Sequence, residues 1–248
     1  REGMSVRGLG FRNVLLLTGE APQVITPEYM EQVLERLRPH FTSIGIEMFP
    51  MTVERYRELI GQGVDSLTVF QETYDEASYG EFHPAGRKSD YRWRLETPER
   101  GGAAGFRRLG IGPLLGLNDW RVEGFFVALH ANYLLRNCWK SQIAISFPRL
   151  RRSAVGYAPP APVGDRDLVQ LICAFRLVLP DAGLTLSTRE SPALRDHLIP
   201  LGITTMSAGS HTEPGGYARA SGGVQQFAVA DGRSPGAVAD ELCRQGYE

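Results

Sequence analysis

The sequence predicts an α/β protein, and specifically a (β/α)8 barrel from which one strand is missing. Short runs rich in Val, Ile and Leu alternate with longer segments of helical period, which is typical of repeated βα units around a parallel sheet. Seven such strands can be counted in 248 residues, a length that suits one barrel-sized domain. No glycine-rich turn of the dinucleotide-binding type follows the first strand, so we favour the barrel over an open doubly wound sheet. Residues 1–248 are therefore interpreted as one partial barrel domain, and the eighth strand is expected upstream.

The first βα unit has the clearest signals. Val14 to Leu17 is a short apolar run, which predicts a strand. Thr26 and Pro27 then predict the start of a helix, because a threonine hydroxyl caps free backbone N–H groups and a proline fits the first helical turn. The same alternation predicts strands at 44–49 and 66–70 and a helix at 53–61. A long loop is expected to run through Arg94, followed by a helix that is capped by Thr97.

The second half of the chain repeats this pattern. Apolar runs predict strands at 111–115, 142–147, 184–187 and 203–207. Segments of helical period predict helices at 122–137, 167–179 and 192–198. Together with the first three strands, these four give the count of seven, one short of a closed barrel.

Composition excludes several classes of protein. The net charge of -1, from 27 basic and 28 acidic residues, argues against nucleic acid or an anionic membrane as the main partner. No apolar run reaches the roughly 20 residues that span a bilayer. Three widely separated cysteines predict reduced thiols and a cytoplasmic location. The scattered histidines form no metal-binding motif, so we expect no metal ligands within these residues.

Polar residues follow nearly every predicted strand, at the end where barrels carry their chemistry. They are Thr18-Gly19-Glu20, Glu47, Gln71-Glu72-Thr73-Tyr74, Asn118-Asp119, Arg149, Ser187-Thr188-Arg189-Glu190 and Ser210-His211. Carboxylates and arginines dominate this set, which suits the binding of a zwitterion better than it suits hydrolysis. Schiff-base chemistry is disfavoured because the chain has only Lys88 and Lys140, neither well placed. A serine hydrolase is disfavoured because G-x-S-x-G is absent.

Several of these segments, taken in order, carry a specific resemblance. They are Thr18-Gly19-Glu20, Gln71-Glu72-Thr73-Tyr74, Trp93-Arg94-Leu95-Glu96-Thr97-Pro98, Ser146-Phe147-Pro148-Arg149-Leu150-Arg151, Leu186-Ser187-Thr188-Arg189-Glu190-Ser191-Pro192 and Pro214-Gly215-Gly216-Tyr217. Across nearly the whole chain, the sequence resembles the 2-iminoacetate synthase family of thiamine biosynthesis, the radical S-adenosylmethionine (SAM) tyrosine lyases. The family's cluster-binding motif, C-x3-C-x2-C, is absent. We therefore expect that the chain begins in the first helix of the barrel and stops short of the family's C-terminal tail.

The resemblance implies a radical SAM barrel followed by a part associated with thiamine and biotin synthesis. It implies that SAM binds to a [4Fe–4S] cluster, whose ligands are expected upstream, and that a 5′-deoxyadenosyl radical abstracts hydrogen from L-tyrosine. The Cα–Cβ bond then breaks to give 2-iminoacetate (dehydroglycine) and p-cresol. Implied partners are thiazole synthase and an electron donor such as flavodoxin or ferredoxin.

Site residues are transferred from the family by position. Thr18, Gly19 and Glu20 match the segment that binds the SAM ammonium group, and Arg94 matches an arginine that pairs with the SAM carboxylate. Gln71 and Thr73 lie in the segment that meets the SAM ribose. Ser187 and Arg189 are predicted to bind the tyrosine carboxylate. Arg149 and Tyr74 are further candidates for the substrate pocket. No residue is assigned as a catalytic acid, base or nucleophile.

Three alternatives remain open at this stage. A tyrosine lyase of the hydrogenase-maturation type would share the first cleavage and hold a second cluster on a C-terminal cysteine pair, for which Cys243 alone is insufficient. The chain could also be a catalytically silent barrel that acts as a binding subunit, or a metal-free lyase that uses only acid and base groups.

Overall fold

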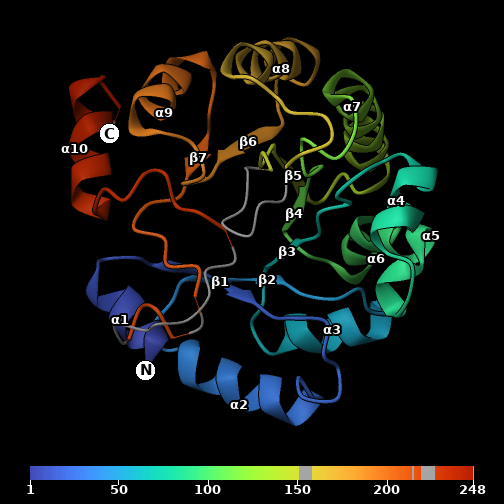
Figure 1. Ribbon diagram of the computed structural model, residues 1–248. Helices are drawn as coiled ribbons and strands as arrows, with labels where there is room; N and C mark the ends of the chain where they lie inside the picture. Colours follow the sequence, from blue (N-terminus) through green and yellow to red (C-terminus); the bar gives the residue numbers. More distant parts are fainter. Residues whose placement is uncertain (151–157, 214, 219–226, 248) are drawn as a thin grey trace.

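The computed structural model describes residues 1–150, 158–213, 215–218 and 227–247. Within these ranges, seven parallel strands form one sheet whose spatial order, β1-β2-β3-β4-β5-β6-β7, is the order of the sequence. A doubly wound sheet reverses its order at a switch point, so this topology excludes that alternative. The sheet curls into part of a barrel with the helices around its outside (Figure 1). The (β/α)8-like fold with seven strands is therefore confirmed.

Strand bounds show which residues face one another. The strands are β1 (Asn13–Leu17), β2 (Ser43–Glu47), β3 (Ser66–Thr68), β4 (Arg108–Ile111), β5 (Gln142–Ser146), β6 (Gly183–Leu186) and β7 (Thr205–Met206). Their register places in one row across the sheet Leu17, Glu47, Thr68, Gly110, Ala144 and Gly183. Glu47 is the one charged residue of this row.

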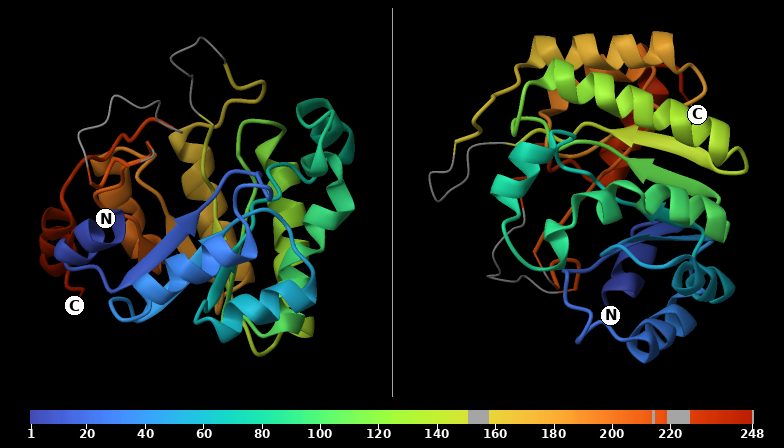
Figure 2. Two further views of the ribbon diagram at one scale, coloured as in Figure 1. Left: turned by 90° about the horizontal axis from the view of Figure 1, so that it is seen from below. Right: turned by 90° about the vertical axis from the view of Figure 1, so that its right-hand side faces the viewer.

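Apart from α1, which precedes β1, each helix comes after a strand, and the helices surround the sheet on its outer side (Figure 2). They are α1 (Glu2–Gly8), α2 (Pro27–Leu37), α3 (Val53–Gly61), α4 (Glu76–Phe82), α5 (Tyr91–Leu95), α6 (Thr97–Ala104), α7 (Trp120–Asn137), α8 (Asp165–Val178), α9 (Pro192–Leu198) and α10 (Pro235–Arg244), with 3₁₀ turns η1 (Arg87–Ser89) and η2 (Ile199–Leu201). None of the described helices is both long and apolar enough to cross a membrane.

The two faces of the sheet differ in chemistry. Side chains alternate between faces along a strand, and a Cβ at Gly101 of α6 would meet Leu67 and Leu109, so these two leucines face the helices. The outer face also carries Ile44, Ile46, Ile111, Ile143, Ile145, Leu184 and Leu186, all buried in the hydrophobic core. The residues between them therefore face the inside of the barrel, where small or polar side chains predominate.

Several predicted elements were placed wrongly. The loop before Arg94 is largely helical, because Asp75 and Asp90 cap α4 and α5 by accepting from Ser78 N and Trp93 N. Thr97 does not cap α6; it is the first helical residue, and its hydroxyl donates to Trp93 O at 2.8 Å. The fourth strand ends at Ile111 instead of beginning there, and the last strand spans only two residues.

A buried ion-pair network attaches the C-terminal segment to α9. Arg195 of α9 and Asp231 are fully buried and form an ion pair. Arg233 donates to Asp231 and, at 2.8 and 3.0 Å, to the carboxylate of Asp196. This network holds the chain that leads into α10 against the last helix of the barrel.

Candidate functional site

The carboxyl ends of all seven strands lie along one rim of the barrel because the strands are parallel. The segments that follow β1, β3 and β6 contribute Thr18, Gln71 and Arg189 to this rim, and β2 contributes its last residue, Glu47. Arg94 reaches the rim from α5. The structure thus gathers five polar residues that are far apart in the sequence.

Two of these residues carry buried polar atoms that form no hydrogen bond to any described residue. Gln71 is 2% exposed, and both its Oε1 and its Nε2 lack a partner. Thr18 Oγ1 also lacks a hydrogen-bond partner, and so does the hydroxyl of Thr188, the residue before Arg189 in the loop after β6. Because an unpaired buried polar group costs about 1–3 kcal/mol, this arrangement favours a polar ligand that provides the missing hydrogen bonds.

Glu72 organises the segment next to Gln71. Its backbone has φ of +72°, a conformation that few non-glycine residues adopt. Its carboxylate accepts from His83 Nε2 at 2.8 Å, pairs with Lys88, and lies 3.7 Å from Arg94. Burial alone would raise the pKa of Glu72, but the three neighbouring basic groups lower it below its ordinary value. Glu72 is therefore an ionised anchor for the residues around it.

Arg94 is held by the exit of β3. Its Nε donates to Phe70 O at 2.8 Å, and its Nη2 faces Glu72. Glu96 pairs instead with Arg100, and Glu99 accepts from a tyrosine hydroxyl. Arg94 is thus fixed at the rim by contacts with β3 residues and not by a surface ion pair on its own helix.

Glu47 and Arg189 interact electrostatically. Burial raises the pKa of Glu47 to about 7, although the charges of Arg189 and Arg94 lower it in part. Burial likewise lowers the pKa of Arg189 to about 10, against the attraction of Glu47 and Glu190. The guanidinium of Arg189 stacks on Phe227, 3.8 Å from the ring centroid. Both groups therefore lie in a poorly solvated part of the rim.

The remaining predicted substrate residue at this strand end supports Arg189. Ser187 Oγ accepts a hydrogen bond from Arg189 N at 3.3 Å, which fixes the backbone of the loop after β6. Gly19 and Glu20 lie exposed at the exit of β1, where Gly19 O accepts from Ala21 N at 2.9 Å.

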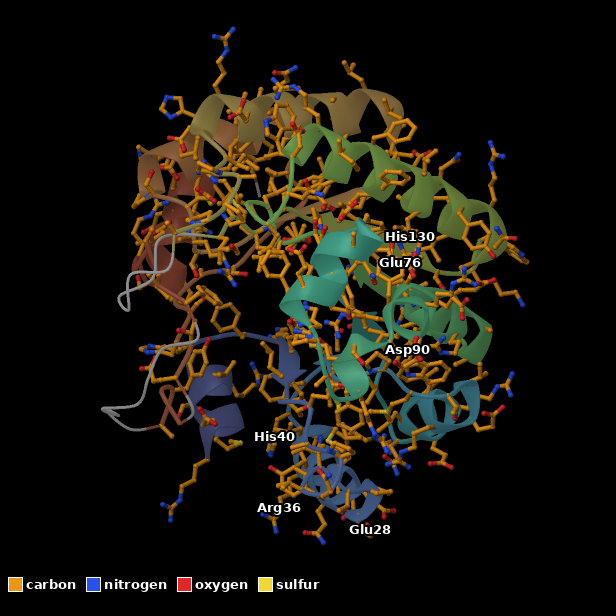
Figure 3. All side chains as sticks on the ribbon, turned by 45° about the vertical axis from the view of Figure 1, so that its right-hand side comes forward. Glu28, Arg36, His40, Glu76, Asp90 and His130 are labelled. Carbon is orange, nitrogen blue, oxygen red and sulfur yellow. The ribbon has the colours of Figure 1, made fainter. Side chains whose placement is uncertain are left out.

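Thr73 and Tyr74 lie elsewhere, in the wall between the loop after β3 and helix α7. The Thr73 hydroxyl donates to Glu123, and Tyr74 N donates to Glu123 Oε2 at 2.9 Å. The Tyr74 hydroxyl contacts His130 Nδ1 at 2.9 Å, and Figure 3 labels His130 on α7. Because their polar side-chain atoms are used inside the protein, Thr73 and Tyr74 are placed to support the loop of Gln71.

Arg149 is also used internally. It is 2% exposed and donates to Glu190 Oε1 at 2.9 Å, to Val163 O at 3.0 Å and to Asp165 Oδ1 at 2.7 Å. These bonds join the loops that follow β5 and β6. Arg151 and Pro214, which belong to two of the matching motifs, lie outside the described residues.

Glu47 is the functional candidate that sequence reasoning left out of the site, although its position within the second strand was noted. A usable signal existed, because Glu47 shares its strand face with Ser43 and Gly45, while the apolar Ile44 and Ile46 point the other way. Within the described ranges, no group of three or more His, Cys, Asp and Glu side chains is arranged to hold a metal ion.

A domain profile matches the C-terminal part of the chain, fewer than half of its residues. It is described as the Biotin and Thiamin Synthesis associated domain and covers residues 146–248. The match begins at the last residue of β5 and includes Ser187 and Arg189.

Two curated relatives match the whole chain. They are the 2-iminoacetate synthases of Salmonella typhimurium and Escherichia coli, each 45% identical over 249 residues. The match covers 100% of this chain and 66% of each relative, so the chain spans slightly less than two thirds of their length.

Two solved structures of HydG, a maturase of the [FeFe]-hydrogenase, have the same architecture. One has a TM-score of 0.91 at 33% identity over 100% of this chain and 56% of its own. The other, from Carboxydothermus hydrogenoformans, has a TM-score of 0.90 at 32% identity over 99% of this chain and 57% of its own.

Proposed function

We propose that the chain is a member of the 2-iminoacetate synthase family, with whose curated members it shares 45% identity, and that it forms the barrel of a radical SAM lyase. The reaction is cleavage of the Cα–Cβ bond of L-tyrosine to 2-iminoacetate and p-cresol. The observation that carries this proposal is the match of 45% identity over the full chain, combined with the unpaired polar atoms at the rim.

The rim residues fit SAM by their chemistry. The buried amide of Gln71 and the hydroxyl of Thr18 both lack protein partners among the described residues, and both can hydrogen-bond to the hydroxyl groups of a nucleoside. Arg94 offers a guanidinium for a carboxylate, and Glu20 a carboxylate for an ammonium group. We assign the SAM site to Thr18, Gly19, Glu20, Gln71 and Arg94. Thr73 is assigned a supporting role, because its hydroxyl is bound to Glu123.

A [4Fe–4S] cluster is part of this proposal. SAM and the reduced cluster, when bound, supply a carbon radical that takes a hydrogen atom from the substrate. The C-x3-C-x2-C motif is absent from these 248 residues, so we place the cluster ligands in a segment outside them. The residues of this chain contribute by orienting SAM and the substrate at the rim.

The tyrosine site is assigned to the loop after β6. Arg189 can form two parallel hydrogen bonds with the substrate carboxylate, since a guanidinium presents a planar fork. Ser187 fixes the backbone of that loop, and the ring of Phe227 limits the directions in which the guanidinium can point. Arg149 supports the same loop through its hydrogen bond to Glu190. Tyr74 contributes to the wall behind Gln71.

The protein context follows from the same family. We propose thiazole synthase as the acceptor of 2-iminoacetate, flavodoxin or ferredoxin as the electron donor, and the cytoplasm as the location. The net charge of -1 supports neither a nucleic-acid partner nor an anionic membrane surface.

The likeness to HydG favours one alternative, a tyrosine lyase of the hydrogenase-maturation type, whose structures match at 33% identity. The higher identity to the 2-iminoacetate synthases supports the thiamine assignment. Iron analysis separates the two, because a single cluster gives about four iron atoms per full-length chain and a second cluster gives more. The first test is anaerobic incubation of the full-length enzyme with SAM, L-tyrosine and reductant. Formation of p-cresol and of glyoxylate, the hydrolysis product of 2-iminoacetate, would support the proposal; absence of both would overturn it.

A further inference from the structure

Glu47 has an unusual position for a carboxylate. It ends β2 and lies on the inner face of the barrel, in the row formed with Leu17, Thr68, Gly110 and Ala144. None of these neighbours carries a charge. Among the described residues, none donates a hydrogen bond to the carboxylate of Glu47. Its two partners on the neighbouring strands, Leu17 and Thr68, are both described. A carboxylate in such surroundings needs a partner from outside the protein or a role that requires it.

The charged groups around Glu47 are few and come from different elements. Arg189 follows β6, Arg94 lies on α5, and Glu72 follows β3; among charged groups, these three have the largest effect on the pKa of Glu47. The two arginines favour its ionised form and Glu72 opposes it. The carboxylate of Glu47 therefore has both positive and negative groups around it, and no hydrogen bond or ion pair with a described residue occupies it, so it can bind a further cation.

Glu47 and Arg189 attract each other without forming a direct contact. Glu47 is the last residue of β2 and Arg189 lies in the loop after β6, so both stand on the same rim of the parallel sheet, yet no ion pair joins them in the described structure. Their charges still lower the pKa of Glu47 and raise that of Arg189 against the effect of burial. Arg189 is instead held by stacking on Phe227, and its backbone by Ser187. A carboxylate and a guanidinium that are separated in this way can be bridged by a molecule with opposite charges at its two ends.

An α-amino acid has that charge pattern, because its carboxylate and ammonium group are attached to the same carbon. We propose that Glu47 binds the α-ammonium group of the substrate while Arg189 binds its carboxylate. This inference rests on the proposed function, since it takes the substrate to be tyrosine bound at Arg189. It adds a residue from β2 that the motif comparison did not include. Because Glu47 and Arg189 would hold two groups attached to Cα, they would also fix the direction of the Cα–Cβ bond.

Glu47 could instead contact the phenol of the substrate or SAM, and binding measurements with different ligands distinguish these two partners from the ammonium group. Phloretic acid, the deaminated analogue of tyrosine, has the phenol and the carboxylate but no amine. L-Phenylalanine has the amine and the carboxylate but no phenol. If Glu47 contacts the phenol, its removal affects phloretic acid and spares phenylalanine. If Glu47 contacts SAM, its removal weakens SAM itself.

The experiment measures binding in the full-length holoenzyme without reductant, so that no turnover occurs. Equilibrium dialysis gives the dissociation constants of L-tyrosine, L-phenylalanine and phloretic acid in the presence of SAM, and that of SAM alone. The variants are Glu47→Gln, which keeps the shape of the side chain, and Glu47→Asp, which keeps the charge. Glu35→Gln, at an exposed position on α2, is the matched control.

We expect Glu47→Gln to weaken L-tyrosine and L-phenylalanine by ten- to a hundredfold, the usual effect of losing one charge-assisted contact. The affinities of the variant for phloretic acid and for SAM should stay within about twofold of the wild-type values. Glu47→Asp should recover part of the lost tyrosine affinity, and the control should match the wild type. Unchanged SAM binding also shows that the variant is folded.

Four results would overturn the inference. They are weaker binding of SAM itself, equal weakening of tyrosine and phloretic acid, weakening of phloretic acid but not phenylalanine, or no weakening of tyrosine. A wild-type holoenzyme that binds no L-tyrosine would remove the proposed function and this inference with it. A wild type that binds and cleaves tyrosine while Glu47→Gln binds it normally would remove the inference alone.

Discussion

Arg94 of α5 donates a hydrogen bond from Nε to the backbone carbonyl of Phe70 at 2.8 Å. Phe70 lies two residues beyond β3, and its backbone carbonyl cannot rotate away as a side chain can, so the guanidinium keeps its place at the rim. The Nη2 atom of the same guanidinium lies 3.7 Å from Glu72 Oε1. The segment that contains α4 and α5 therefore places one fixed cation, the guanidinium of Arg94, at the rim.

Arg94→Ala should weaken SAM binding by ten- to a hundredfold, since it removes one charge-assisted contact worth about 1.5–3 kcal/mol. Tyrosine binding, measured separately, should change much less. Arg92→Ala is the matched control, because Arg92 is exposed on the same helix. Equal losses for SAM and tyrosine would contradict the assignment of Arg94 to the SAM carboxylate.

Arg189→Lys should keep cluster content and SAM binding but raise the tyrosine requirement. Lysine preserves the charge and loses both the planar fork and its stacking on Phe227. A misplaced Cα–Cβ bond should uncouple the reaction, so that 5′-deoxyadenosine forms in excess over p-cresol. Arg166→Lys, at an exposed position of α8, should behave as wild type. If Arg189→Lys keeps normal tyrosine affinity and coupling, Arg189 does not bind the carboxylate.

Glu47→Gln should stabilise the ligand-free protein at high pH. Burial raises the pKa of Glu47 from 4.5 to about 7 in the folded protein, so the protonated carboxyl stabilises the fold fully below pH 4.5. This stabilisation is lost as the pH rises through 7, because the buried group must then ionise. A glutamine cannot ionise, so the variant does not lose stability in this way. Its free energy of unfolding relative to wild type should therefore rise between pH 5 and pH 8, by up to about 3 kcal/mol. Denaturant unfolding at several pH values measures this difference, and a flat difference would show that Glu47 is well solvated.

Asp231→Asn should destabilise the protein at neutral pH by about 3–5 kcal/mol, because it leaves the buried Arg195 without its counter-charge. Burial would raise the pKa of Asp231, but bonds from Arg233 and the charge of Arg195 lower it to about 2. Its contribution is therefore complete above pH 3.8 and is lost as the pH falls toward 2. Urea unfolding should show a large gap between variant and wild type at pH 7 that narrows below pH 3. Asp240→Asn, exposed on α10, should show no gap.

The strand count, the parallel sheet and the sequential order could all be predicted from periodicity, because alternating apolar runs determine them locally. The exit residues Thr18, Gln71 and Arg189 could be chosen by the same reasoning. The helices α4 and α5 were missed, since each is short and depends on an aspartate cap. The fourth strand was shifted because Gly112 and Pro113 interrupt its apolar run.

The internal use of a polar side chain could not be predicted. Thr73, Tyr74 and Arg149 follow their strands as site residues do, yet their partners Glu123, His130 and Glu190 come from distant segments. Only the tertiary structure decides whether a polar residue at a strand end meets a ligand or another side chain. Glu47 shows the converse, because the alternation along its strand already indicated its face, but only the register with Leu17 and Thr68 shows that its neighbours there carry no charge.

The ratio of p-cresol to 5′-deoxyadenosine tests the central claim most directly. The full-length, reconstituted enzyme is reduced anaerobically with SAM and L-tyrosine, and both products are quantified over the first turnovers. The proposed tyrosine lyase predicts that the two products form together in a ratio close to one, and that neither exceeds background when tyrosine is replaced by buffer at the same SAM concentration. Formation of 5′-deoxyadenosine without p-cresol in the presence of tyrosine would contradict it.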